Sequence, residues 1–155
     1  MTSTPTIIKH YSNGGTIEIY TCFEHKEPHY DRVYACCKHF AGQGKRTIIM
    51  PRIHYKDPAY KAIYKSLIGT KYEKKCPDFS VDGTFYEHEG FTSTNSKNAF
   101  HKMCNRGFRQ CENVILEDCN LSDSYMIRSI NGQMKSGVSI KGVWILSKEG
   151  IRRLY

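Results

Sequence analysis

Apolar and polar residues alternate with a period of two in several short stretches of the chain. Thr16–Cys22 and Lys45–Met50 are rich in β-branched and other apolar residues, which favours strands. Residues 113–117 and 142–146 are apolar enough for buried strands, and residues 151–155 can pair with the latter as a terminal hairpin. The pattern therefore predicts a sheet built from strands spread along the whole chain.

Between these strands, apolar residues recur with helical spacing. From His29 to Ala41 they fall at i, i+3, i+4 and i+7, which is one face of a helix packed on a sheet, and further helices are expected from Pro58 onward, over Ser96–Phe108 and over Leu121–Lys135. We predict an α/β protein with a central mixed β-sheet flanked by helices, forming a single domain over residues 1–155, with residues 1–15 as a mobile lead-in ending in a turn. The expected inward residues are Val33, Cys36, Cys37 and Phe40, then Tyr60, Ile63, Tyr64 and Leu67, then Phe100, Met103, Cys104 and Phe108, and finally Tyr125, Ile127, Ile130 and Met134.

The most informative stretch is an acidic hairpin over residues 78–91. Phe79 and Val81 alternate with polar residues, and Asp82-Gly83 is a strong signal for a two-residue turn. Residues 84–91 form the expected return strand. Asp82 is then a turn residue, because an Asp-Gly turn needs its tolerance of positive φ.

Side chains alternate between the two faces of a strand, so Glu87 and Glu89 share a face and His88 points the other way, into core packing. The hairpin brings Asp78, at the start of its first strand, beside this pair. Carboxylates that converge repel one another unless a cation compensates, and oxygen ligands suit Mg²⁺ or Mn²⁺. Asp78 and Glu87 are the expected metal ligands. The alternative is a solvated strand edge whose acids discourage aggregation.

Charge and composition narrow the class of protein. The chain has 39% hydrophobic residues, as in a globular protein. Its 23 basic and 15 acidic residues give a net charge of +8, which favours a polyanionic partner such as nucleic acid, although moderate basicity is also a route to solubility. No apolar run reaches membrane-spanning length and the N-terminus lacks leader features, so we expect a cytoplasmic protein without a membrane partner. The seven cysteines show no C-x-x-C pair and are expected as buried thiols.

Two groups of basic residues lie where nucleic acid could contact them. The loop before the hairpin carries three lysines and a tyrosine, which are suited to phosphates and to a stacked base, and the helix after it has a basic face. Each group could equally be a solvated charged surface. The expected nucleic-acid-binding residues are Lys71, Tyr72, Lys74, Lys75, Lys102 and Arg106.

Pro77-Asp78, followed after eight residues by Glu87-His88-Glu89, resembles the PD-(D/E)xK nuclease signature. Residues 76–91, the helix over 97–110 and the strand over 143–146 are similar to the C-terminal tRNase domains of contact-dependent inhibition toxins and to related small proteins of Bacteroides-type bacteria. The resemblance covers roughly the last two thirds of the chain. It implies a restriction-endonuclease-like core and a metal-dependent endonuclease that cleaves tRNA or another structured RNA in preference to DNA, with a possible immunity-type protein partner.

The chain departs from the signature at one position, because Glu89 stands where a lysine is expected. Glu89 is either a further metal ligand or the occupant of the lost lysine position. A cation is needed to orient the attacking water or to stabilise the transition state, and Lys97 is the first candidate, with Lys71 and Lys75 next. Gln110 resembles a glutamine that members of the family carry at the end of this helix, where its amide could bind phosphate or a metal-bound water.

Two alternative functions stay open at this point. Glu89 in place of lysine favours a non-catalytic module that binds nucleic acid or protein on a decayed nuclease fold. The histidines permit a metal-independent ribonuclease that uses general acid–base chemistry on the RNA 2′-hydroxyl.

Overall fold

The computed structural model describes residues 4–23, 30–91 and 96–155. The chain forms two compact units, the first over Met1–Phe85 and the second over Tyr86–Tyr155. Each unit contains a mixed sheet and helices, which confirms the predicted α/β class.

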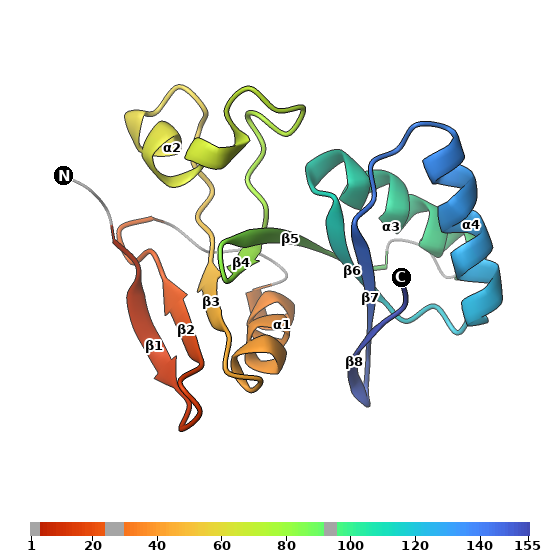
Figure 1. Cartoon of the computed structure of the whole chain (residues 1–155), viewed down its shortest axis with the longest axis horizontal. Helices are drawn as coiled ribbons and strands as arrows, with labels where there is room; N and C mark the ends of the chain where they lie inside the picture. The colour runs from red at the N-terminus through yellow and green to blue at the C-terminus, as the bar shows by residue number, and fades with distance from the viewer. Residues whose placement is uncertain (1–3, 24–29, 92–95) are drawn as a thin grey trace. The chain divides into compact units, whose positions relative to one another are not determined.

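The first unit holds strands β1 (Thr6–His10), β2 (Thr16–Ile19), β3 (Arg46–Ile49) and β4 (Phe79–Val81). β1 pairs with β2 antiparallel, β2 with β3 parallel, and β3 with β4 antiparallel (Figure 1). The sequence analysis placed residues 6–10 in a lead-in, whereas the structure places them in β1, a strand whose residues are all exposed. An exposed strand buries no apolar face, so it leaves no alternating pattern that sequence reasoning could detect.

The sheet of the first unit carries helical segments on both faces. Helix α1 (Tyr30–Ala41) buries the predicted residues Val33, Cys36, Cys37 and Phe40, and the ring of Phe40 lies 6.3 Å from that of Phe79 in β4. Side chains on the other face pack against α2 (Pro58–Ile63) and the short 3₁₀ helix η1 (Lys65–Leu67). Asp57 caps α2 by accepting a hydrogen bond from the Ala59 amide, as the Asp-Pro signal predicts.

The predicted turn at Asp82-Gly83 is present. Asp82 has φ 48° and Gly83 has φ 85°, so both residues adopt the left-handed conformation of a type I′ turn. Asp82 also accepts a hydrogen bond from the backbone amide of Arg46 at 3.0 Å, which ties the turn to the start of β3. The role of Asp82 as a turn residue is confirmed.

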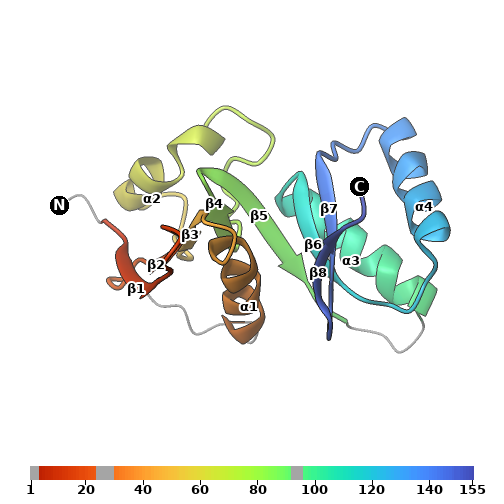
Figure 2. The same cartoon turned by 60° about the horizontal axis from the view of Figure 1, so that its bottom comes forward.

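The second unit begins at Tyr86, within the first strand after this turn, and contains the strands that follow. β5 (Thr84–Glu89), β6 (Asn113–Glu117) and β7 (Gly142–Ser147) are parallel neighbours, and β8 (Gly150–Arg153) pairs with β7 antiparallel. Helices α3 (Ser96–Gln110) and α4 (Asp123–Lys135) both lie on one side of β6 and β7 (Figure 2).

The core of the second unit lies between those two helices and the sheet. Phe100, Met103, Cys104 and Phe108 of α3 are all buried there, as predicted from their spacing. Of the four inward residues predicted for α4, Ile130 is buried, Tyr125 and Ile127 are half-buried, and Met134 is 38% exposed, while Met126 is buried although it was not predicted. The helix faces the core through Met126 and Ile130, which are an i, i+4 pair. Other apolar residues flank this pair in the sequence, so spacing alone did not identify it.

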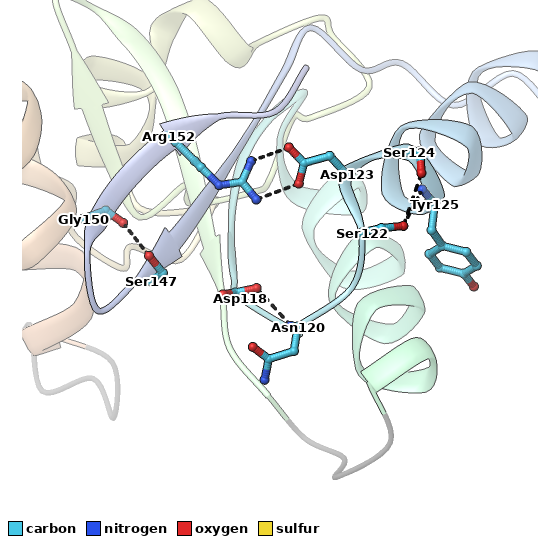
Figure 3. A network of polar contacts seen from close by, with 9 residues as sticks. All are labelled: Asp118, Asn120, Ser122, Asp123, Ser124, Tyr125, Ser147, Gly150 and Arg152. Atoms are coloured by element: carbon cyan, nitrogen blue, oxygen red, sulfur yellow. Dashed lines mark hydrogen bonds and ion pairs between the residues drawn. The ribbon is translucent and has the colours of Figure 1, made fainter.

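The start of α4 is fixed by polar contacts (Figure 3). Ser122 caps the helix by accepting a hydrogen bond from the Tyr125 amide. The guanidinium of Arg152 in β8 donates two hydrogen bonds to the carboxylate of Asp123, each of 2.8 Å. This paired contact joins the last strand to the first turn of the last helix, where a carboxylate also suits the helix dipole.

None of the helices in the described residues has both the length and the hydropathy needed to span a bilayer.

Candidate functional site

Asp78 lies directly before β4 in the first unit and is half-buried. Its carbonyl accepts a hydrogen bond from the Met50 amide at 3.0 Å, which continues the β3–β4 pairing past the end of the strand. Its charge influences the pKa values of two neighbouring residues, Cys37 and Tyr64. Burial raises the pKa of the Cys37 thiol to about 12, and Asp78 acts in the same direction. Burial likewise raises the pKa of Tyr64 well above its usual value, again with a contribution from Asp78.

Glu87 lies in β5, in the second unit, opposite Val114 of β6. It is half-buried, and its charge adds to the effect of burial in raising the pKa of the Cys111 thiol to about 12. Val114 and Leu116, the partners of Glu87 and Glu89, belong to the core beneath α3 and α4. The two glutamates therefore share the helix-covered face of the sheet, as the alternation predicted.

Glu89 is held by an arginine. Its carboxylate accepts a hydrogen bond from Arg106 Nε at 2.9 Å, and Arg106 Nη2 donates to the carbonyl of Gly90 at 2.8 Å. The Glu89 side chain is only 14% exposed, so the ion pair is largely shielded from water. Arg106 from α3 is thus the cation that pairs with Glu89, the residue that stands where the resembled signature has a lysine. Sequence analysis assigned Arg106 to a nucleic-acid-binding face and did not pair it with Glu89.

His88 is buried, as expected for a residue on the opposite face from Glu87 and Glu89. Its Nε2 lies 3.1 Å from Oε1 of Glu117, at the end of β6. Sequence analysis missed Glu117. The residue closes an apolar strand, and its role as the partner of His88 follows from the parallel register of β5 and β6.

The remaining predicted residues of the second unit are on α3. The ammonium of Lys97, the first candidate for the catalytic cation, lies over the ring of Tyr125 in α4, 5.2 Å from its centre. The two side chains form a cation–π contact. Lys102 is exposed, and Gln110 is the half-buried last residue of the helix.

The lysine-rich loop of the first unit uses its aromatic residues for packing. Tyr72 is only 9% exposed and belongs to the core beside α2, so its ring is not presented for stacking on a base. Lys71 lies over the Tyr72 ring and Lys74 over that of Tyr55, at 5.1 and 4.7 Å from the ring centres. Lys75 is half-buried, with its carbonyl accepting a hydrogen bond from the Tyr60 hydroxyl.

A metal centre built wholly from protein ligands is not evident in the described part of the chain. There, no three side chains of His, Cys, Asp or Glu gather as a group that could hold a metal ion. Since Mg²⁺ commonly uses one or two carboxylates together with water and substrate phosphates, Asp78 and Glu87 still provide donors of the right chemistry.

No protein family and no curated protein matches the sequence. Among solved structures, the fold is similar to that of a chain in the CdiA-CT/CdiI toxin and immunity complex from Burkholderia pseudomallei. The match has a TM-score of 0.50 and 16% sequence identity, and covers 79% of this chain and 81% of that chain. The likeness shows a fold found in a toxin–immunity complex.

Proposed function

We propose that this protein is a metal-dependent nuclease of the toxin type, which hydrolyses phosphodiester bonds in tRNA or another structured RNA. Asp78 and Glu87 would hold one Mg²⁺ or Mn²⁺ ion, and the chemistry that such an ion would supply is activation of a water and polarisation of the phosphate. The fold match supports the toxin–immunity context, because the matched chain comes from such a complex.

The type I′ turn at Asp82-Gly83 is the observation that carries the proposal. A two-residue turn of this type pairs strand residues symmetrically on either side of it. Asp78 precedes Asp82 by four positions and Glu87 follows Gly83 by four, and from this spacing we propose that they are cross-strand partners, as in a regular hairpin. The side chains of such partners share one face, which is the arrangement that a bridging cation needs.

Arg106 completes the proposed chemistry. In the nuclease signature that the sequence resembles, a lysine at the third motif position supplies positive charge near the phosphate. Here we propose that the guanidinium of Arg106, which donates to Glu89 at 2.9 Å and is 37% exposed, supplies this charge instead. An arginine fork binds phosphate oxygens well, so it can stabilise the charge that develops in the transition state.

The test is a cleavage assay on labelled tRNA and on plasmid DNA with Mg²⁺, with Mn²⁺ and with EDTA. We expect cleavage of RNA that EDTA abolishes, and a fall of about 10²-fold or more in Asp78→Asn and in Glu87→Gln. Glu149→Gln is the matched control, since it removes an exposed carboxylate from the β7–β8 turn and should leave the rate unchanged. Full activity in Asp78→Asn or Glu87→Gln would refute the assignment.

A non-catalytic binding protein is the second candidate function. The ion pair between Glu89 and Arg106 favours it, because a structural contact occupies the position of the motif lysine. It predicts RNA or protein binding without cleavage under every metal condition. Cleavage that persists in EDTA would point instead to a metal-independent ribonuclease.

An immunity-type protein partner belongs to the same proposal. The structure with the similar fold is a complex of a toxin with its immunity protein, so a dedicated protein partner would fit this chain in either role. If the chain is the toxin, its partner should abolish cleavage in the same assay. If the chain is the immunity protein, no nuclease activity is expected from it.

A further inference from the structure

The first unit contains a cavity of about 560 Å³ on the side of its sheet that faces α2 and η1. Tyr20, Ile48, Met50 and Phe85 supply apolar and aromatic walls. All of the described lining residues belong to this unit. The volume is within the usual range for small-molecule sites, roughly 300–1,000 Å³.

Polar groups enter this cavity from two elements. Ser80 of β4 is only 3% exposed and lines the cavity, while Lys65 and Ser66 reach it from η1 and are exposed. None of the described residues that line the cavity is acidic. Lys65 is the one charged residue among the described lining residues. The cavity therefore combines aromatic walls, hydroxyl groups and positive charge, which suits a flat ring that carries an anion.

The cavity adjoins the strand end that carries Asp78. Ile48 pairs with Ser80 in the β3–β4 register, and the Met50 amide donates to the Asp78 carbonyl at the next step of the ladder. Asp78 directly precedes β4, and the hydrogen bond from Met50 continues the ladder to it, so alternation puts it on the same side of the sheet as Ser80. Tyr64, whose pKa the charge of Asp78 helps to raise, also contacts the ring of Phe85 in the cavity wall.

We propose that this cavity binds one unpaired nucleobase of a nucleic-acid strand, with Lys65 contacting its phosphate and Ser66 and Ser80 contacting the edge of the base. The proposal extends the proposed nuclease function, since a base held here would bring the neighbouring phosphate to Asp78. An unpaired base is required because a base within a duplex is stacked on both faces and paired along its Watson–Crick edge, so it cannot enter a cavity. The protein would therefore select single-stranded or looped segments of its substrate.

The test measures binding of UMP, AMP and a short single-stranded RNA to the intact chain in EDTA, so that cleavage cannot interfere. Ser66→Trp should fill the mouth of the cavity and Lys65→Glu should repel the phosphate. We expect each variant to weaken binding about fivefold or more, in line with the loss of one stacked base or one phosphate contact. Ala62→Trp and Lys61→Glu are matched controls, since both positions are exposed on α2 and do not line the cavity.

The same variants are then compared in the cleavage assay, and thermal melting verifies that each one folds. The cavity proposal is supported if Ser66→Trp and Lys65→Glu weaken nucleotide binding while the two control variants bind like the wild-type protein. This result would stand even if no cleavage is seen with any metal, because the absence of cleavage would refute the nuclease function alone. The cavity proposal is overturned if the nucleotides fail to bind, if all four variants bind alike, or if a duplex binds as well as the single strand. Cleavage with an unchanged KM in Ser66→Trp and Lys65→Glu would overturn it while the nuclease function stands.

Discussion

At the scale of single residues, two largely buried glutamates in the described part of the chain, Glu18 and Glu89, are held by arginines. Arg46 donates to both carboxylate oxygens of Glu18, at 2.7 and 2.9 Å, and Arg106 donates to Glu89 at 2.9 Å. Both glutamates are mostly buried, so removing either arginine would leave a charge without its compensating partner. Removing one partner of a buried ion pair destabilises a protein much more than removing one partner of an exposed pair does.

Restoring the motif lysine by Glu89→Lys should therefore destabilise the protein. Two cations would meet at a largely buried position, and we expect the free energy of unfolding to fall by about 2–3 kcal/mol in urea titrations. The double variant Glu89→Lys with Arg106→Glu should recover part of the loss.

Glu112→Lys is the matched control for that experiment. It reverses a charge in the pair between Glu112 and Lys141, whose lysine is 70% exposed, and should cost less than about 1 kcal/mol. A loss in Glu89→Lys no larger than in Glu112→Lys would show that the ion pair with Arg106 contributes little.

The second arginine-held glutamate gives a prediction about pH. The hydrogen bond from Arg46 lowers the pKa of Glu18 below its ordinary value of 4.5 in the folded protein. The folded state then binds fewer protons than the unfolded state, so this stabilisation is present above pH 4.5 and is lost as the pH falls through the lowered pKa.

Urea unfolding between about pH 6 and pH 3 measures this effect. Glu18→Gln should be less stable than the wild-type protein at the upper end, and its stability should fall less steeply with acid. Glu149→Gln, which also removes one negative charge, should follow the wild-type curve. Parallel curves for the wild-type protein and Glu18→Gln would contradict the assigned cause.

At the scale of elements, burial decided what the sequence could reveal. α1 and α3 present regular apolar stripes to a core, and their buried residues were predicted correctly. β1 buries nothing and was missed, and α2 ends at Ile63, before the last residue of its predicted stripe. Leu67 still reaches the core because η1 continues the chain as a 3₁₀ helix.

The candidate site was predictable only where strand geometry fixes it. Alternation was enough to place Glu87 and Glu89 on one face and His88 on the other, and Asp-Gly was enough to place the turn. The partners Arg106 and Glu117 come from α3 and β6, so they depend on how separate elements pack. Spacing along a chain carries no such information.

The turn at Asp82-Gly83 can be tested at its glycine. Gly83→Ala should destabilise the protein by about 1 kcal/mol in urea titrations, because φ 85° is costly for any residue with a Cβ. Crowding is not the cause, since a Cβ at this position would meet no atom within 4 Å.

Gly132→Ala separates the two effects. Gly132 lies inside α4, where a Cβ would also meet nothing within 4 Å, and its backbone is helical. Alanine there should stabilise the protein by about 0.5–1 kcal/mol. If both substitutions change stability in the same direction, the left-handed conformation at Gly83 is not what the turn depends on.

At the scale of the whole molecule, the chain divides into two compact units whose cores can be examined separately. The cluster around α3 and α4 draws its buried residues from positions 99 to 145, all within the second unit. The first unit has a cluster of its own around Tyr60 and Tyr64. Sequence analysis predicted a single domain, because neither a linker nor a shift in composition marks the boundary near Phe85.

The free cysteines allow the opening of each unit to be measured. Cys37 is buried in the first unit and Cys104 and Cys119 in the second, and burial raises their thiol pKa values to about 12, 12 and 11. A thiol in this state reacts with an alkylating reagent only when its surroundings open. Exposed Cys22 should react at once and serves as the reference for the intrinsic rate.

We predict that each unit opens largely on its own. Ile130→Ala removes a fully buried side chain from the cluster that holds Cys104 and Cys119, and a cavity of this kind costs about 2–5 kcal/mol. Alkylation followed by mass spectrometry should show Cys104 and Cys119 labelled about tenfold faster or more, with a smaller change at Cys37. Val33→Ala, in the first unit, should accelerate Cys37 more than Cys104. If either substitution increases the alkylation rate of all three thiols equally, the two units open together, because a cavity in one core would then destabilise the other core as well.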